Sequence, residues 1–259
     1  MKTLLIATAL LASTIAPAFA DDASEQAARW QDVATATFGE RVIEDGSALL
    51  KLTTPERTMN AALVPITIEL TGDKRIKALS VVVDNNPSPL AGTFTFGPAF
   101  AQNILKMRIR VNEFTLVHAV AEMEDGKLYQ VAKFVKAAGG CSSPSAVASD
   151  DVLSRLGKMQ LRRERGIDAA SVPAQLLISH PNFSGMQQDA KTGEYTPARY
   201  LEKVSVSVGG AKVFDLESGI SLSEDPAISF AYKANGDGAV DIKAQDSSSA
   251  QFSEHFNAL

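Results

Sequence analysis

The chain has 259 residues, with 25 Lys and Arg against 30 Asp and Glu, three His and one Cys. This length allows one large domain or two of moderate size, each able to form a hydrophobic core without a metal or disulfide framework. The formal net charge of −5 argues against a nucleic-acid-binding protein, which usually carries a basic face. A single cysteine excludes an intramolecular disulfide and any multi-cysteine metal site.

The first twenty residues have the features of a secretory signal peptide. Lys2 supplies a positive charge, residues 4–15 are apolar, and Ala18-Phe19-Ala20 is a small-x-small signal, which predicts cleavage after Ala20. The apolar stretch is shorter than the roughly 20 residues that span a bilayer, so we expect no membrane anchor. The mature protein is expected in the periplasm, an oxidising compartment where a lone thiol is either free and reactive or paired with another chain.

A helix followed by many short strands is expected in the mature chain. Ser24 is a suitable N-cap and Gly39 a natural stop, with Trp30 and Phe38 packing on the core. Afterwards the hydrophobic pattern alternates with period two, and Asp125-Gly126 is one of several turn signals. The strands expected from this pattern are 64–70, 76–83, 94–96, 107–111, 115–122 and 128–135, followed by 176–178, 200–208, 211–216, 228–232 and 240–244. The C-terminus around His255 is expected to be irregular.

A polar segment, residues 142–172, interrupts the strand pattern. It opens with a run of small residues and continues with a charged stretch that contains Arg162-Arg163-Glu164-Arg165. We expect a linker with solvated arginines, and one helical turn or a short strand near 157–161. The sequence therefore predicts an all-β protein with two antiparallel sandwich domains, residues 21–141 and 173–259.

The cysteine lies between these two domains, directly after two glycines. Gly139 and Gly140 give the backbone wide freedom and leave no side chains to shield the sulfur of Cys141. With Ser142-Ser143-Pro144 behind it, this segment is expected to be exposed, whereas a buried cysteine would behave as a small hydrophobe. A free thiol has a pKa near 8.5, and only its thiolate is a good nucleophile.

Several short motifs give both domains a family resemblance. The first domain resembles SoxY, the carrier of bacterial sulfur oxidation, and its matching residues are Val64-Pro65, 83–89 (Val-Asp-Asn-Asn-Pro-Ser-Pro), Arg108-Ile109-Arg110, 119–122, 125–129 (Asp-Gly-Lys-Leu-Tyr) and Gly139-Gly140-Cys141. The second domain resembles SoxZ, and its matching residues are 178–181 (Ile-Ser-His-Pro), 184–186 (Ser-Gly-Met), Asp189, 197–198, 213–214, 220–223 (Ile-Ser-Leu-Ser), 225–226 (Asp-Pro) and 229–230. Fused chains of this kind are similar to the SoxYZ-like carriers associated with quinoprotein alcohol dehydrogenases.

The resemblance implies two immunoglobulin-like sandwiches that pair within the chain, and a carrier protein that is not itself an enzyme. It assigns covalent attachment of a substrate or sulfur adduct to Cys141, with Gly139 and Gly140 as the carrier arm. It implies no cofactor or metal, and its partners would be periplasmic enzymes of sulfur or thiosulfate oxidation, or a quinoprotein dehydrogenase. The arm of a separate SoxY chain ends at its C-terminus, whereas here the chain continues, so an arm tethered at both ends sweeps less volume.

Other functions remain open from the residues alone. The protein could be a non-covalent scaffold for a periplasmic dehydrogenase, with Cys141 dispensable or in an intermolecular disulfide. A cysteine-dependent enzyme would need His118 or His180 beside the thiol, and nothing in the sequence brings either there. The three scattered histidines lack metal-ligand spacing. Arg108 and Arg110 share one face of a strand, which is either a solvated face or a partner surface.

Overall fold

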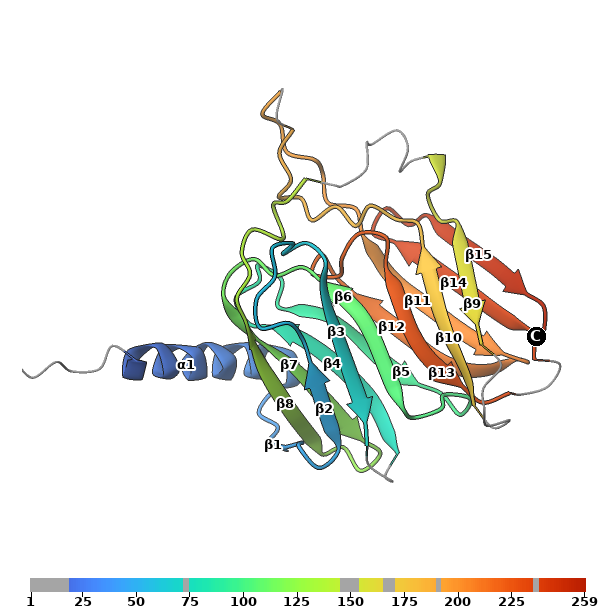
Figure 1. The fold of residues 1–259 in the computed structure, drawn as a ribbon, viewed down its shortest axis with the longest axis horizontal. Coiled ribbons are helices and arrows are strands. Elements are labelled where there is room, and N and C mark those ends of the chain that lie inside the picture. Colours follow the sequence, from blue (N-terminus) through green and yellow to red (C-terminus); the bar gives the residue numbers. More distant parts are fainter. Residues whose placement is uncertain (1–18, 72–74, 145–153, 165–170, 190–191, 235–237) are drawn as a thin grey trace, which may run out of the picture.

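The computed structural model describes the chain except residues 1–18, 72–74, 145–153, 165–170, 190–191 and 235–237. The expected signal peptide, except for its last two residues, lies outside the described residues. The first described element is helix α1 (Phe19–Phe38), which begins before the expected N-cap, Ser24, and extends away from the strands (Figure 1). It ends as expected at Gly39, whose φ is 71° and whose N–H donates to Thr35 O at 2.9 Å. No helix among the described residues is long and apolar enough to cross a membrane.

Among the described residues, fifteen strands follow the helix. Those of the first half are β1 (Ile43–Asp45), β2 (Leu50–Thr53), β3 (Val64–Leu70), β4 (Ile76–Val83), β5 (Leu90–Phe96), β6 (Ile104–Ile109), β7 (Thr115–Met123) and β8 (Leu128–Val135). Those of the second half are β9 (Met159–Arg163), β10 (Val172–Ile178), β11 (Leu201–Val208), β12 (Ala211–Ser218), β13 (Ala227–Tyr232), β14 (Val240–Asp246) and β15 (Gln251–Phe256). The all-β prediction, with immunoglobulin-like sandwich packing and one helix, is confirmed.

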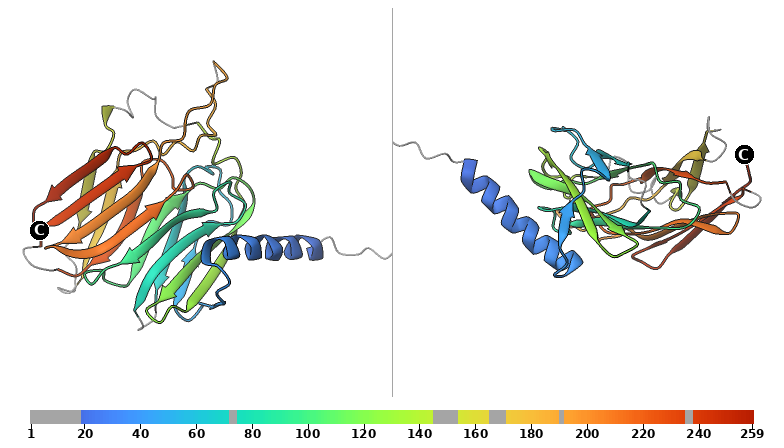
Figure 2. Two further views of the ribbon diagram at one scale, coloured as in Figure 1. Left: turned by 180° about the vertical axis from the view of Figure 1, so that it is seen from behind. Right: turned by 90° about the horizontal axis from the view of Figure 1, so that it is seen from below.

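The two halves share both sheets. One sheet has nine strands in the order β1-β8-β7-β4-β5-β12-β11-β14-β15, and the other has six in the order β2-β3-β6-β13-β10-β9. Strand β5 pairs with β12 in an antiparallel register that sets Phe94 against Leu216, and β6 meets β13 where Lys106 lies opposite Ser229. Figure 2 (left) shows the larger sheet running across both halves without a break. The halves are therefore joined edge to edge through the backbone.

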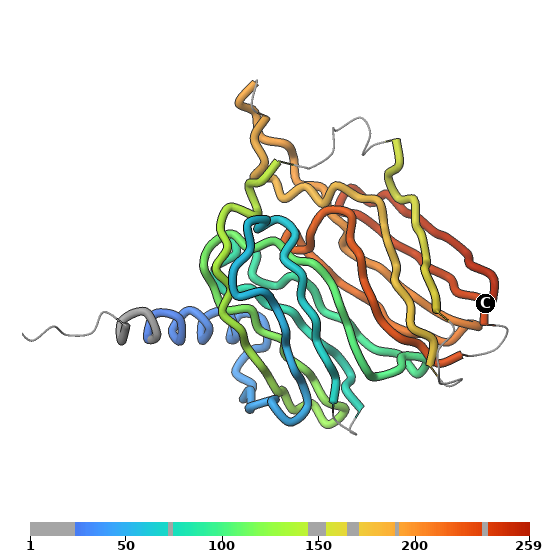
Figure 3. Tube along the Cα trace, in the orientation of Figure 1, coloured from blue at the N-terminus to red at the C-terminus, as the bar shows by residue number. Residues whose placement is uncertain are grey.

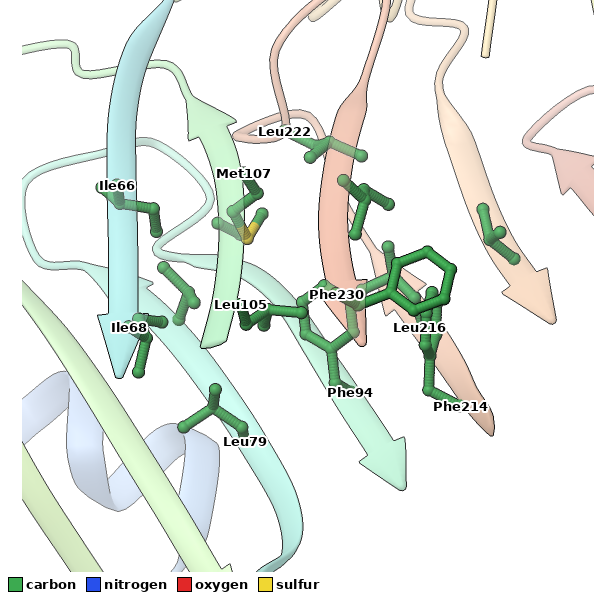
Figure 4. Packing of buried hydrophobic residues seen from close by; sticks show 14 of the residues in the cluster. Ile66, Ile68, Leu79, Phe94, Leu105, Met107, Phe214, Leu216, Leu222 and Phe230 are labelled. Atoms are coloured by element: carbon green, nitrogen blue, oxygen red, sulfur yellow. The ribbon is translucent and has the colours of Figure 1, made fainter. Parts of the chain in front are cut away.

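One hydrophobic core lies between the sheets and passes through the junction. Alternating residues point inward, as in β3, where Val64, Ile66 and Ile68 are buried. At the junction Phe214 contacts Phe94 from the first half and Phe230 from the second, with ring centroids 5.4 and 5.1 Å apart (Figure 4). Such edge-to-face pairs add to the free energy gained from burying the rings.

Three strands were missed in the sequence. Strands β1 and β2 are only three and four residues long, which is too short for a periodic signal. Strand β15 includes His255, in the segment expected to be irregular, and that expectation is wrong. Its side chains are mostly exposed, since it lies at the edge of the nine-stranded sheet, so it lacks the buried alternation that identifies a strand.

Candidate functional site

The sulfur-bearing side chain of Cys141 is buried, with a relative exposure of 0%. The expectation of an exposed arm is therefore wrong for this structure. After β8 the chain runs beside the segment that follows β6, because Gly139 N donates to Asn112 O at 2.8 Å and Gly140 N to Val111 O at 2.9 Å. The carbonyl oxygen of Cys141 then accepts a hydrogen bond from Ser184 of the second half.

The two glycines have different roles in this arrangement. Gly139 has a φ of 78°, and its carbonyl oxygen accepts hydrogen bonds from Ser142 Oγ at 3.2 Å and Ser143 Oγ at 2.8 Å. A Cβ on Gly140 would lie 2.1 Å from Ala61 O, so this position requires a glycine because the backbones pack too closely for any side chain. The sequence suggested a mobile arm, whereas the structure shows a tightly packed turn.

Arg110 connects the arm to the second half of the chain. Its side chain is fully buried, and it donates through Nη1 to Gly140 O at 3.1 Å and through Nη2 to Asn182 O at 3.2 Å. Burial lowers the pKa of Arg110, while the nearby Glu224 carboxylate and the Cys141 thiol oppose this shift. The solvated-face interpretation of this arginine is wrong, because it lies inside the junction between the halves.

Arg108 makes a parallel connection two residues earlier. It is half-buried, and its Nη2 donates to the carbonyl oxygen of Asp225 at 2.8 Å. Both arginines therefore bind main-chain oxygens of the second half. These hydrogen bonds join the two halves of the chain.

The segment after β10 supplies the other contacts to the arm. Ser184 Oγ donates to the carbonyl oxygen of Cys141 at 2.5 Å, and Ser184 is held by Gln187 Oε1, which accepts from its N–H at 2.9 Å. Asn182, with a φ of 43°, donates through Nδ2 to Ser223 O at 2.8 Å. Figure 3 shows this segment beside the chain that leads to residue 144. In the sequence Ser184 is only part of a family motif, because residues 43 positions apart carry no local signal of contact.

Two buried donors beside the arm have no acceptor in the described part of the chain. They are Arg110 Nε and Gln187 Nε2. Buried donors without partners cost free energy, so this junction is less well satisfied than the surrounding core. Such a junction costs less to open than a fully hydrogen-bonded one.

The thiol is unreactive in this conformation. Burial raises the pKa of Cys141 to about 11, although the positive charge of Arg110 acts in the opposite direction. Almost no thiolate forms at neutral pH with such a pKa, and the sulfur is also shielded from solutes. The cysteine can react as a nucleophile only after the arm leaves the junction.

Neither candidate histidine is hydrogen-bonded to the thiol. His180 is buried, with Nδ1 at 2.7 Å from Asn182 Oδ1 and Nε2 at 3.4 Å from Asp246 Oδ2, and its burial lowers its pKa. His118 lies 2.8 Å from Gln130 Oε1 through Nδ1. Both rings already have partners on each nitrogen, so the geometry provides no Cys–His catalytic pair.

Trp30 of helix α1 covers His118 on the outer side of the nine-stranded sheet. The two rings are stacked, with centroids 3.6 Å apart and planes inclined by 5°. His118 Nε2 is 3.1 Å from Asp84 Oδ2. This cluster is a docking contact for the helix. In the described part of the chain, no group of three or more His, Cys, Asp and Glu side chains is arranged to hold a metal ion.

Comparison with known families identifies both halves of the chain. The family model "Sulfur oxidation protein SoxY" matches residues 34–141 and ends on Cys141, and the model "Sulphur oxidation protein SoxZ" matches residues 163–257. These matches place the chain among the carrier proteins of sulfur oxidation. Within that class it belongs to the SoxY–SoxZ family, with a SoxY domain followed by a SoxZ domain in one chain.

Similar solved structures each cover part of this chain. The sulfur carrier protein SoxY from Chlorobium limicola f thiosulfatophilum is 24% identical, with a TM-score of 0.37, over 45% of this chain and 98% of that chain. A superoxide reductase (neelaredoxin) from Ignicoccus hospitalis is 14% identical, with a TM-score of 0.34, over 39% of this chain and 98% of that chain. No curated protein sequence matches the chain.

Proposed function

We propose that the protein is a periplasmic covalent carrier that holds a substrate or sulfur adduct on Cys141 and presents it to partner enzymes. The observation that carries this proposal is the position of the only cysteine, at the last residue of the SoxY match and on a turn held by the second domain. Proteins of this family work with partner enzymes of sulfur oxidation. A quinoprotein dehydrogenase is the other partner that we propose for a fused chain.

The carrier cycle requires the arm to open. The hydrogen bonds that must break include those of the Gly140 carbonyl to Arg110 and of the Cys141 carbonyl to Ser184. Each contributes about 1 kcal/mol net, or somewhat more for the charged donor, so a partner that binds the open arm can supply the cost. Outside the junction the thiol pKa returns toward about 8.5, which restores its nucleophilicity.

Attachment of a sulfur group to the thiol is an oxidation. The Cys141 thiolate forms a bond to the incoming sulfur, and two electrons pass to an acceptor that the partner enzyme must supply. The carrier contributes the nucleophilic thiolate. It also determines when the thiol is exposed, because the arm must open before the thiol can react. Once the arm closes again, the residues that now bury the thiol would shield the attached group from solution.

Intact mass spectrometry of the protein purified from its native host tests this proposal. We expect a mature mass that corresponds to cleavage after Ala20, plus an adduct that a thiol reductant removes. The Cys141→Ser variant should carry no adduct and should not support growth on the relevant substrate. An unmodified native protein, together with normal growth of the Cys141→Ser strain, would refute covalent carriage.

A non-covalent scaffold for a periplasmic dehydrogenase is the second candidate, and the burial of Cys141 favours it. In that case Cys141 is a packing residue, and its raised pKa follows from that role. The Cys141→Ser variant would then keep both partner binding and phenotype. Migration on a non-reducing gel separates this candidate from a disulfide-linked dimer, which needs the arm to be open.

A further inference from the structure

A basic hollow, whose lining does not include Cys141, lies on the outer face of the six-stranded sheet. It has a volume of ≈ 350 Å³, which exceeds that of a small oxyanion with its nearest waters. The lining residues belong to β6, to β9 and the turn before it, to the end of β10, and to the segment before β13. The polar lining residues are Arg108, Arg155, Lys158, Gln160, Ser179 and Asp225.

One of the cations is fixed by a bidentate ion pair. Arg155 donates through Nη1 to Asp225 Oδ1 at 3.1 Å and through Nη2 to Asp225 Oδ2 at 2.8 Å. Its Nη1 also donates to Ser179 Oγ at 3.0 Å. A planar guanidinium held on both sides in this way is pre-organised and loses little freedom when a further acceptor arrives.

The other two cations lack a carboxylate partner. Arg108 bonds only a neutral carbonyl oxygen of Asp225, and its Nε has no acceptor in the described part of the chain. Lys158 is exposed, and no ion pair involves it among the described residues. Among the described residues, the lining carries three cations against one carboxylate, in a chain whose net charge is −5. A concave surface with a net positive charge concentrates anions at that point.

We propose that this hollow is a binding site for a small dianionic oxyanion, such as sulfate or hydrogen phosphate, held by Arg108 and Lys158 beside the fixed Arg155. Among the described lining residues the excess of positive charge is two, which matches a dianion better than a monoanionic carboxylate. Guanidinium and ammonium groups form charge-assisted hydrogen bonds with such oxygens. The site uses none of the groups that hold the Cys141 arm, so it stands independently of covalent carriage.

Amide-resolved NMR titration of the mature protein tests this proposal, with sodium sulfate as the probe and sodium chloride at equal ionic strength as the reference. We expect saturable shifts at Lys158, Gln160 and Ser179 with sulfate and none that saturate with chloride. Sodium acetate should bind more weakly than sulfate. Equal shifts with chloride would show screening alone, and equal binding of acetate would overturn the dianion assignment.

Two variants and a matched control complete the test. Arg108→Gln and Lys158→Gln should each weaken sulfate binding about tenfold or more, because each removes a charged hydrogen-bond donor. Lys158 is exposed, so its substitution leaves the fold intact even where Arg108→Gln does not. Lys203→Gln removes the same charge from a hollow on the nine-stranded sheet that contains no guanidinium, and it should leave the affinity unchanged. Unchanged affinity in Lys158→Gln would refute the site.

Discussion

Arg110 and Gly140 are joined by a hydrogen bond from the buried guanidinium to the carbonyl oxygen that precedes the cysteine, with Nη1 and O 3.1 Å apart. The other end of the same guanidinium binds Asn182 O in the second domain. One side chain of the first domain therefore holds the arm and the opposing loop together. The accessibility of the thiol depends on this contact.

Substitution of Arg110 should expose the thiol. In Arg110→Met the two hydrogen bonds to main-chain oxygens are lost, while an apolar chain replaces the aliphatic stem of the arginine. We expect Cys141 to react with a maleimide at least tenfold faster, as a shift of about 1.4 kcal/mol toward the open arm requires. Lys106→Met, at an exposed position of β6, is the control and should react as the wild type does. An unchanged rate in Arg110→Met would show that the hydrogen bonds of Arg110 do not keep the arm closed.

Gly140→Ala should open the arm by a steric route. The added methyl group would lie 2.1 Å from Ala61 O and 2.6 Å from Val111 O, and both are backbone atoms that cannot rotate away. The turn must leave its position, so thiol reactivity should rise. Gly210→Ala is the control for backbone strain, because its φ is 77° but nothing lies within 4 Å of the new methyl group. We expect Gly210→Ala to lose about 1 kcal/mol of stability and to keep the thiol buried. If the thiol reacted equally fast in Gly140→Ala and Gly210→Ala, the steric explanation would be wrong.

The pH dependence of thiol modification should report the buried state. A pKa of about 11 for Cys141, against about 8.5 for a free cysteine, lowers the thiolate fraction at pH 7 by ~300-fold. The rate of reaction with iodoacetamide should therefore keep rising up to about pH 11 in the folded protein, and should level off near pH 8.5 to 9 in urea. A folded protein with a midpoint near 8.5 would show that the arm is mostly open.

The two domains should unfold as one unit. Phe214 of the second half is fully buried against Phe94 of the first half, and both sheets are continuous across the junction. Phe214→Ala should cost about 3–5 kcal/mol, and the loss should appear in the fluorescence of Trp30, the only tryptophan, which lies in the first half. Phe114→Ala, at an exposed position, should cost far less. Two separate transitions in denaturant would contradict this coupling.

Acid should weaken the fold through Asp246. Burial raises the pKa of its carboxyl, but hydrogen bonds from Ser248, Arg199 and the backbone of Ala250 outweigh that effect and leave the pKa at about 2. Because this value is below that of the unfolded chain, the stabilisation is present above about pH 4 and is lost as pH falls toward 2, by roughly 2 kcal/mol. Denaturant titrations from pH 5 to pH 2 measure this loss. Asp246→Asn should flatten that slope, whereas Asp241→Asn, at the exposed pair with His255, should not.

Most of the strands could be predicted from the sequence, because one face of each is buried and period two follows from that. The pairing of β5 with β12 could not, since an edge-to-edge junction buries the same alternating residues as two separate sandwiches would. The strand pattern therefore predicts the elements but not the partner across the junction.

The position of the candidate site could be predicted from the sequence, but the burial of its thiol could not. A single cysteine after two glycines identified Cys141, whereas local composition wrongly indicated exposure. Its burial depends on Arg110 and Ser184, which are 31 and 43 positions away along the chain. Arg110 looked like a surface residue because an arginine that alternates with apolar residues usually faces solvent. Only the tertiary contact to Gly140 O reverses that expectation.

The continuous sheets also bear on solubility. If the two domains came apart, β5 and β12 would become free edges in the larger sheet, and β6 and β13 in the smaller one. Unpaired edges recruit strands from other molecules and promote aggregation. Fusion into one chain keeps the complementary edges at high mutual effective concentration. The covalent connection between the two halves therefore protects the protein from mispairing.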